Sequence, residues 1–122
     1  MAKITHKSYN QNDSLLLPPS LGELIPPTHP VRAVNNILDR LDISEIESTY
    51  KGGGTSSYHP RMLLKVVVYA YLCNVYSGRQ MEKLLYENIH FMWLSGMSRP
   101  DFRTINRFRS ERLTDGRLDA IF

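Results

Sequence analysis

One segment constrains this chain more than any other, because it is apolar on every side of a helix. It begins at Pro60 and runs to about Tyr76, and a helix that is hydrophobic all round is normally buried on all sides. The run of valines also suits a strand, but the flanking helix caps and a length of about four turns favour a helix. The segment predicts a central helix whose apolar residues are Met62, Leu63, Leu64, Val66, Val67, Val68, Ala70, Leu72 and Val75.

Helical spacing of apolar residues recurs on both sides of this segment, and no segment alternates as a half-buried strand would. Pro30 and Pro60 each suit the first turn of a helix, and Asp42 followed by Glu45 suits a cap. Ser77-Gly78 suits the end of the central helix. We therefore predict helices over residues 30–41, 42–50, 60–76, 79–87, 89–94 and 98–113, with a further helical pattern that begins at residue 118.

The chain has 122 residues, enough for one domain. Pro18-Pro19 and Pro26-Pro27 forbid a continuous helix near the start, so an extended arm with one short helical turn is expected over residues 1–27. Three consecutive glycines in residues 51–57 predict a flexible linker, since no Gly-Lys-Ser/Thr follows them as in a phosphate-binding loop. The fold prediction is an all-α, compact multi-helix domain over residues 28–122 that follows this N-terminal arm.

Positive charge is concentrated in the second half of the chain. The formal net charge of +3 divides into −1 for residues 1–60 and +4 for residues 61–122. Arginine outnumbers lysine ten to five, and its planar guanidinium suits two-point contacts with phosphate or guanine. The alternative is a solvated helix face with internal ion pairs, so charge alone leaves nucleic-acid binding open.

Residues 89–113 have the spacing of a helix-turn-helix motif: a short helix, a turn that contains Gly96, and a second helix. Pro100 suits the first turn of the second helix, and Ser98 with Asp101 suits its cap. The aromatic residues before the turn also suggest base stacking. Core packing explains them better, because Tyr86, Phe91 and Trp93 are interleaved with Ile89, Met92 and Leu94.

A helical wheel divides this second helix into two arcs. The apolar arc, which must face the core, holds Phe102, Ile105, Phe108 and Leu113. Arg109 and Arg112 fall inside it and are expected to snorkel or to pair with acidic neighbours. The other arc holds side chains that reach base edges and phosphates in a major groove. The predicted DNA-binding residues are Arg99, Arg103, Asn106, Arg107 and Ser110, with Arg61 and Lys65 of the central helix as further phosphate contacts.

The sequence shows no arrangement of residues that is typical of an enzyme active site. The four histidines are scattered, and none lies at metal-ligand spacing with the single cysteine, Cys73. His29 and His59 each precede a proline that opens a helix, which indicates capping. Nucleophile-elbow, P-loop and dinucleotide motifs are lacking. We expect no catalysis and no cofactor in this chain. The longest apolar run is too short for a bilayer, and we expect a cytoplasmic protein with no membrane contact.

Several strings match one known family. They are Ser57-Tyr58-His59-Pro60-Arg61-Met62-Leu63-Leu64-Lys65, Glu87-Asn88-Ile89-His90-Phe91-Met92-Trp93-Leu94-Ser95-Gly96 and Pro100-Asp101-Phe102-Arg103-Thr104-Ile105-Asn106-Arg107-Phe108-Arg109, with Tyr9-Asn10-Gln11-Asn12 and Leu17-Pro18-Pro19-Ser20-Leu21 before them. Together they resemble the N-terminal domain of bacterial insertion-sequence transposases with an acidic catalytic triad (DDE type).

The resemblance implies a helical domain that precedes a ribonuclease-H-like domain, whose three carboxylates bind divalent metal and cut DNA. It also implies that the helical domain recognises double-stranded DNA at the terminal inverted repeats of the element and assists dimerisation. We therefore expect residues 28–122 to form a DNA-binding domain that stops before the catalytic domain. The alternative is a protein-interaction module that pairs transposase subunits as a homodimer through apolar surface on residues 60–76.

Overall fold

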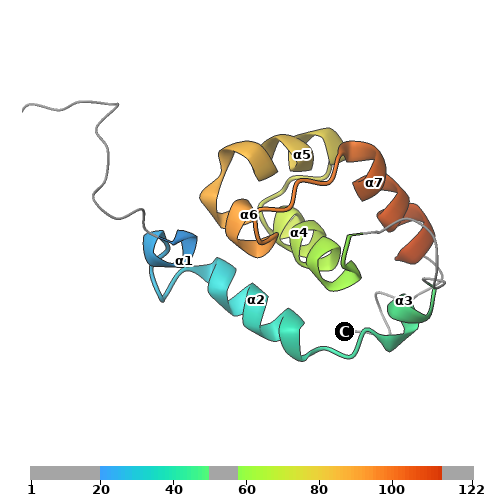
Figure 1. Ribbon diagram of the computed structural model, residues 1–122, viewed down its shortest axis with the longest axis horizontal. Helices are drawn as coiled ribbons and strands as arrows, with labels where there is room; N and C mark the ends of the chain where they lie inside the picture. The colour runs from blue at the N-terminus through green and yellow to red at the C-terminus, as the bar shows by residue number, and fades with distance from the viewer. Residues whose placement is uncertain (1–19, 50–57, 114–122) are drawn as a thin grey trace, which may run out of the picture.

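Helix α4, Pro60–Leu72, runs through the centre of the domain (Figure 1). The computed structural model describes residues 20–49 and 58–113. The prediction that this helix is the most buried one is confirmed within those residues. Its buried side chains are Leu63, Leu64, Val66, Val67, Tyr69 and Ala70, while α2 and α5 bury three residues each.

Helix α4 ends four residues earlier than predicted, at Leu72 rather than Tyr76. Asn74 adopts a left-handed conformation with φ of 61°, which takes the chain out of the helix. The N–H of Asn74 donates to the carbonyl of Tyr71 (3.0 Å), and the N–H of Val75 donates to that of Ala70 (2.8 Å). Ser77-Gly78 therefore does not end this helix: Ser77 caps the next one, which begins at Gly78.

The all-α prediction is confirmed, because the described residues contain helices and no strand. The short turn predicted between the two proline pairs is also present, as α1. The predicted linker over residues 51–57, the helical pattern from residue 118 and the first part of the arm lie outside the described residues. The other elements are α1 Leu21–Leu24, α2 Pro30–Arg40, α3 Ser44–Ser48, α5 Gly78–Glu87, α6 Ile89–Leu94, α7 Phe102–Arg107 and the π-helical turn η1 Phe108–Arg112, which continues α7.

Two histidines start the two helices that open with proline. The N–H of Val31 donates to Nδ1 of His29 (3.1 Å) at the start of α2, and the N–H of Arg61 donates to Nδ1 of His59 (3.0 Å) at the start of α4. Each imidazole thereby accepts one of the first-turn N–H groups that a helix leaves unpaired. The prediction that both histidines are caps is confirmed.

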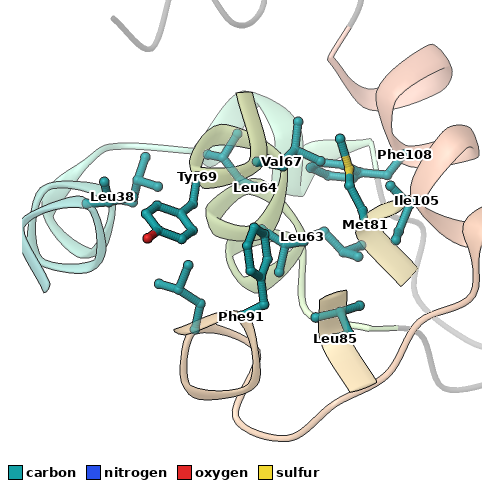
Figure 2. Packing of buried hydrophobic residues seen from close by; sticks show 14 of the residues in the cluster. Leu38, Leu63, Leu64, Val67, Tyr69, Met81, Leu85, Phe91, Ile105 and Phe108 are labelled. Carbon is teal, nitrogen blue, oxygen red and sulfur yellow. The ribbon is translucent and has the colours of Figure 1, made fainter. Parts of the chain in front are cut away.

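The core forms where α2, α5 and α6 pack on α4, and α7 packs in turn on α5. Figure 2 shows Leu38 of α2 on one side of the α4 side chains, and Met81, Ile105 and Phe108 on the other. Phe91 of α6 contacts the ring of Tyr69, with centroids 5.1 Å apart. The core-packing interpretation is confirmed for Phe91. No described helix is long and apolar enough to cross a membrane.

Candidate nucleic-acid interface

The helix predicted to bind DNA begins at Phe102, later in the chain than the sequence suggested. Asp101 is its N-cap, and its carboxylate accepts the N–H of Thr104 (2.8 Å). This hydrogen bond is the main cause of a pKa below the ordinary value for Asp101. Pro100 is buried in the turn before the helix instead of forming its first turn. The predicted capping pair of Ser98 with Asp101 is therefore wrong, because Asp101 is itself the N-cap and Ser98 lies three residues before it.

The two arcs of this helix are arranged largely as predicted. Ile105 and Phe108 are buried in the core. Arg109 is half-buried, and its guanidinium donates to the carbonyl of Tyr76 (2.5 Å), to Oη of Tyr71 (3.3 Å) and to Oδ1 of Asn106 (2.6 Å). Arg112 donates to the carbonyl of Thr49. The prediction that Arg109 and Arg112 lie on the inner side is therefore confirmed. The exposed residues of the helix include Arg103, Asn106, Arg107 and Ser110.

Arg99 departs from the predicted arc, because it lies three residues before the first residue of α7 and does not share the helix with Arg103. Its guanidinium instead lies over the ring of Tyr86 on α5, 4.5 Å from the centroid. Tyr86 is exposed, so the core-packing interpretation is wrong for this residue. The Tyr86 ring supports a cation at the surface.

Asn106 is exposed as a residue, but its amide oxygen is already engaged. Arginine has no acceptor, so the atom that faces Arg109 must be Oδ1. The same amide lies against Gly78 of α5, where an added Cβ would come within 2.3 Å of Oδ1. Only the amide nitrogen, a donor, is without a hydrogen bond in the described part of the chain. Asn106 can offer the N–H groups of its amide to a ligand, while one lone pair of its amide oxygen is already used by Arg109.

Helix α5 adds two cations that the sequence analysis did not single out. Arg79 and Lys83 are exposed and lie one turn apart, opposite the buried Met81 and Leu85. This spacing was visible in the sequence, but only the packing of α7 on α5 brings the two residues beside the DNA-binding residues predicted on α7. No described carboxylate forms an ion pair with them or with the arginines of this side. We call Arg79, Lys83, Arg99, Arg103 and Arg107 the α5–α7 basic surface.

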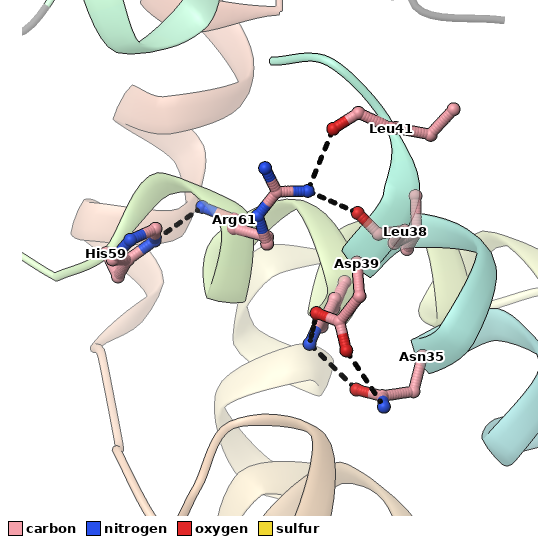
Figure 3. Close-up of polar contacts among 7 residues, drawn as sticks. Asn35, Leu38, Asp39, Leu41, His59 and Arg61 are labelled. Atoms are coloured by element: carbon pink, nitrogen blue, oxygen red, sulfur yellow. Dashed lines mark hydrogen bonds and ion pairs between the residues drawn. The ribbon is translucent and has the colours of Figure 1, made fainter. Parts of the chain in front are cut away.

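Arg61 and Lys65, predicted as phosphate contacts, join α4 to α2 instead. Figure 3 shows Arg61 beside Leu38 and Leu41 of this contact. The guanidinium of Arg61 donates to the carbonyls of Leu38 and Leu41 at the C-terminal end of α2. Nζ of Lys65 lies 2.6 Å from a carboxylate oxygen of Asp39 and donates to Asn35 (2.8 Å). The Lys65 side chain is only 13% exposed. The structure thus places these two cations in contacts within the domain and does not bring them to the α5–α7 basic surface.

The connection between α6 and α7 comprises residues 95–101. Gly96, with φ of 60°, closes α6 as the sequence predicts, and Met97 is also left-handed with φ of 66°. A standard helix-turn-helix turn has about three to four residues, so this connection is longer. The helix on which α7 packs is α5. Any recognition unit here would therefore consist of α5 and α7.

One family model matches most of the chain. It is described as Transposase domain (DUF772), and it covers residues 19–111, which include helices α1 to α7 and all but the last residue of η1. No curated protein and no solved structure is significantly similar to the chain. The matched range contains the central helix, the α5–α7 basic surface and the caps of α2 and α4. The chain therefore belongs to the transposase domain family DUF772.

Proposed function

We propose that this domain binds double-stranded DNA at the terminal inverted repeats of a transposable element. The observation that carries the proposal is the α5–α7 basic surface, where five cations lie on one side of the domain and form no ion pair with a carboxylate of the described residues, although the Asp101 carboxylate attracts Arg103 at longer range. Arg79, Arg99 and Arg103 are held over aromatic rings, and Arg107 follows one turn after Arg103. Phosphates of duplex DNA attract such a surface, and arginine contacts them with two N–H groups at once.

The sequence motifs place this role in a larger protein. Their resemblance to N-terminal domains of bacterial transposases of the DDE type supports a helical domain that holds the element end. The catalytic carboxylates then belong to another domain. In this arrangement, α7 lies in or along the major groove, with Arg107 and Ser110 beside Arg103 on its exposed face. The domain contributes binding, and the cutting of DNA is done elsewhere in the cytoplasmic transposase.

A second candidate is the pairing of transposase subunits. Most of α4 is buried, but its last residue, Leu72, is 66% exposed, and Tyr76 after it is 60% exposed. Exposed large apolar side chains of this kind occur at protein interfaces. A mass measurement by size-exclusion chromatography and light scattering, with and without duplex DNA, separates the two functions. DNA binding by a monomer supports the first, and a dimer that ignores DNA supports the second.

The direct test is fluorescence anisotropy on duplexes that carry the terminal repeat or a scrambled sequence, at two salt concentrations. Arg107→Ala should weaken binding by about 1–3 kcal/mol on the repeat alone if it reads a base. If it contacts phosphate, the loss should be equal on both duplexes, and the salt slope should fall by about one unit. Arg40→Ala is the matched control, because it removes an exposed arginine from α2. Equal binding by folded wild-type, Arg103→Ala and Arg107→Ala proteins would refute the proposal.

A further inference from the structure

Phe102 does not take the position that its helical spacing predicts. It falls on the apolar arc of the wheel, yet in the structure it is half-buried and not part of the hydrophobic core cluster. It is the first residue of α7, at the edge where this helix meets α5. Its N–H donates to the carboxylate of Glu82 on α5 (2.8 Å), which fixes the residue relative to that helix. At the first position of α7 the side chain lies outside the core, whereas Ile105, three residues later, is fully buried.

Two guanidinium groups from two different helices lie over this one ring. That of Arg79 on α5 is 4.0 Å from the ring centroid, and that of Arg103 on α7 is 5.6 Å away. A guanidinium that lies on a ring is attracted by its π-electrons and loses rotational freedom. The N–H groups at its edge still remain free to donate to an oxyanion. The ring therefore holds both arginines in place before any ligand arrives.

We propose that Phe102 is a positioning residue for DNA binding, and that its ring holds Arg79 and Arg103 ready to contact the phosphodiester backbone of one duplex. The inference rests on the proposed function and adds that one ring orders two cations of the α5–α7 basic surface. Holding the side chains beforehand lowers the entropy that binding must otherwise remove. The ring thus raises affinity without adding any charge. Arg99 on the ring of Tyr86 repeats the arrangement at the far end of α5.

The experiment compares Phe102→Leu, Arg79→Lys and Arg79→Ala by anisotropy on duplex DNA over a series of salt concentrations. Phe102→Leu keeps every cation and removes the ring, so affinity should fall about two- to fivefold while the salt slope stays unchanged. Arg79→Lys keeps the charge and loses the planar stacking group, so it should behave in the same way. Arg79→Ala should lower both the affinity and the salt slope, the slope by about one unit. Tyr58→Leu is the control, because it removes an exposed ring on which no described arginine lies.

The outcomes separate this inference from the proposed function. If Phe102→Leu and Arg79→Lys bind like the wild type while Arg107→Ala is impaired, the domain binds DNA and the positioning role of Phe102 is wrong. If wild-type protein shows no binding, both proposals are lost. Should Phe102→Leu fail to fold, Arg79→Lys decides alone, because its exposed side chain can change without altering the core. The NMR signals of the Arg79 side chain give a further check, since their ring-current shifts should disappear in folded Phe102→Leu.

Discussion

The imidazole rings of His29 and His90 stack on each other, with centroids 3.9 Å apart and planes inclined by 20°. His29 caps α2 and His90 lies in α6, so the stack joins two helices that also pack against each other. Nδ1 of His29 accepts the N–H of Val31 (3.1 Å). Burial, and secondly the electrostatic effect of His29, lower the pKa of His90 below its ordinary value of 6.5. Both effects favour the neutral form of His90.

The first prediction is that the free energy of unfolding already falls at pH values above the range in which carboxylates take up protons. In the unfolded chain His90 takes up a proton near pH 6.5, and in the folded domain only at lower pH. Stability is therefore full above about pH 6.5 and falls as the pH drops through the lowered pKa. Urea unfolding between pH 7.5 and 5 should show this slope. His90→Phe keeps a ring against His29 and should flatten it.

An unchanged slope in His90→Phe would contradict this assignment. His29→Asn is the companion variant: asparagine is a good N-cap, and the change removes the secondary effect of His29 on the pKa of His90, so it should flatten the slope in part. Asp101 caps α7, whereas the N-cap of α3 is Ile43 and not Asp42 as predicted; Asp42 still accepts the N–H of Ser44 (2.9 Å). The carboxylates of Asp42 and Asp101 act in a separate pH range. Hydrogen bonds from the first turns lower their pKa values from 3.8, so their contribution is full above that pH and lost as the pH falls further.

Much of the fold was predictable because local signals agreed with the packing. The apolar segment after Pro60 predicted the central helix, and the two His-Pro pairs predicted two helix starts. The end of α4 was not predictable from glycine, because Asn74 supplies the left-handed residue. The start of α7 was not predictable from the sequence alone. Its N-cap is Asp101, and the carboxylate of Glu82 on α5 accepts the N–H of the next residue, Phe102.

The candidate site was predictable only along its own helix. Periodicity placed Arg103 and Arg107 outward and Arg109 inward, as the structure has them. It could not place Arg79, which joins the surface through the packing of α5 on α7. Nor could it place Phe102, whose helical spacing indicates the core although its position at the helix end puts it under two arginines. Such neighbours follow from tertiary contacts, which no local pattern encodes.

The second prediction concerns Gly78, which lets α5 and α7 approach closely. A methyl group there would overlap the Asn106 amide and force it away from Arg109. Overpacking costs about 1–3 kcal/mol, while the helix preference of alanine returns about 1 kcal/mol or less. Gly78→Ala should therefore lower the free energy of unfolding by about 1–2 kcal/mol. In an Asn106→Ala background the same change should be neutral or stabilising, and a double-mutant cycle measures the difference. Additive effects would show that the two residues do not meet.

The third prediction decides between two roles for Arg61. Its hydrogen bonds to α2 carbonyls predict that Arg61→Ala lowers the free energy of unfolding by about 1–3 kcal/mol. The salt slope of DNA binding should stay at the wild-type value, because the guanidinium faces α2. Chemical denaturation and anisotropy on the same protein samples measure both quantities. A salt slope reduced by about one unit would assign a phosphate contact to Arg61 instead.

The last prediction sets two neighbouring arginines of one helix against each other. Arg109 ties η1 to the segment after α4 through Tyr76 and Tyr71, and it also holds the Asn106 amide. Arg109→Ala leaves these acceptors unpaired and should cost about 1–3 kcal/mol of stability. In a domain of this size, each lost kcal/mol lowers the melting temperature by about 4–8 °C. Arg107 is exposed, and its guanidinium has no hydrogen bond to the residues that the structure describes, so Arg107→Ala should change stability by less than about 0.5 kcal/mol. DNA affinity should follow the opposite order when Arg109→Ala is measured well below its melting temperature.

Arg109→Lys should recover only part of the stability, because one ammonium group cannot reach three separated acceptors from the same geometry. Equal melting temperatures for the two alanine variants would mean that the hydrogen bonds of Arg109 do not stabilise the domain.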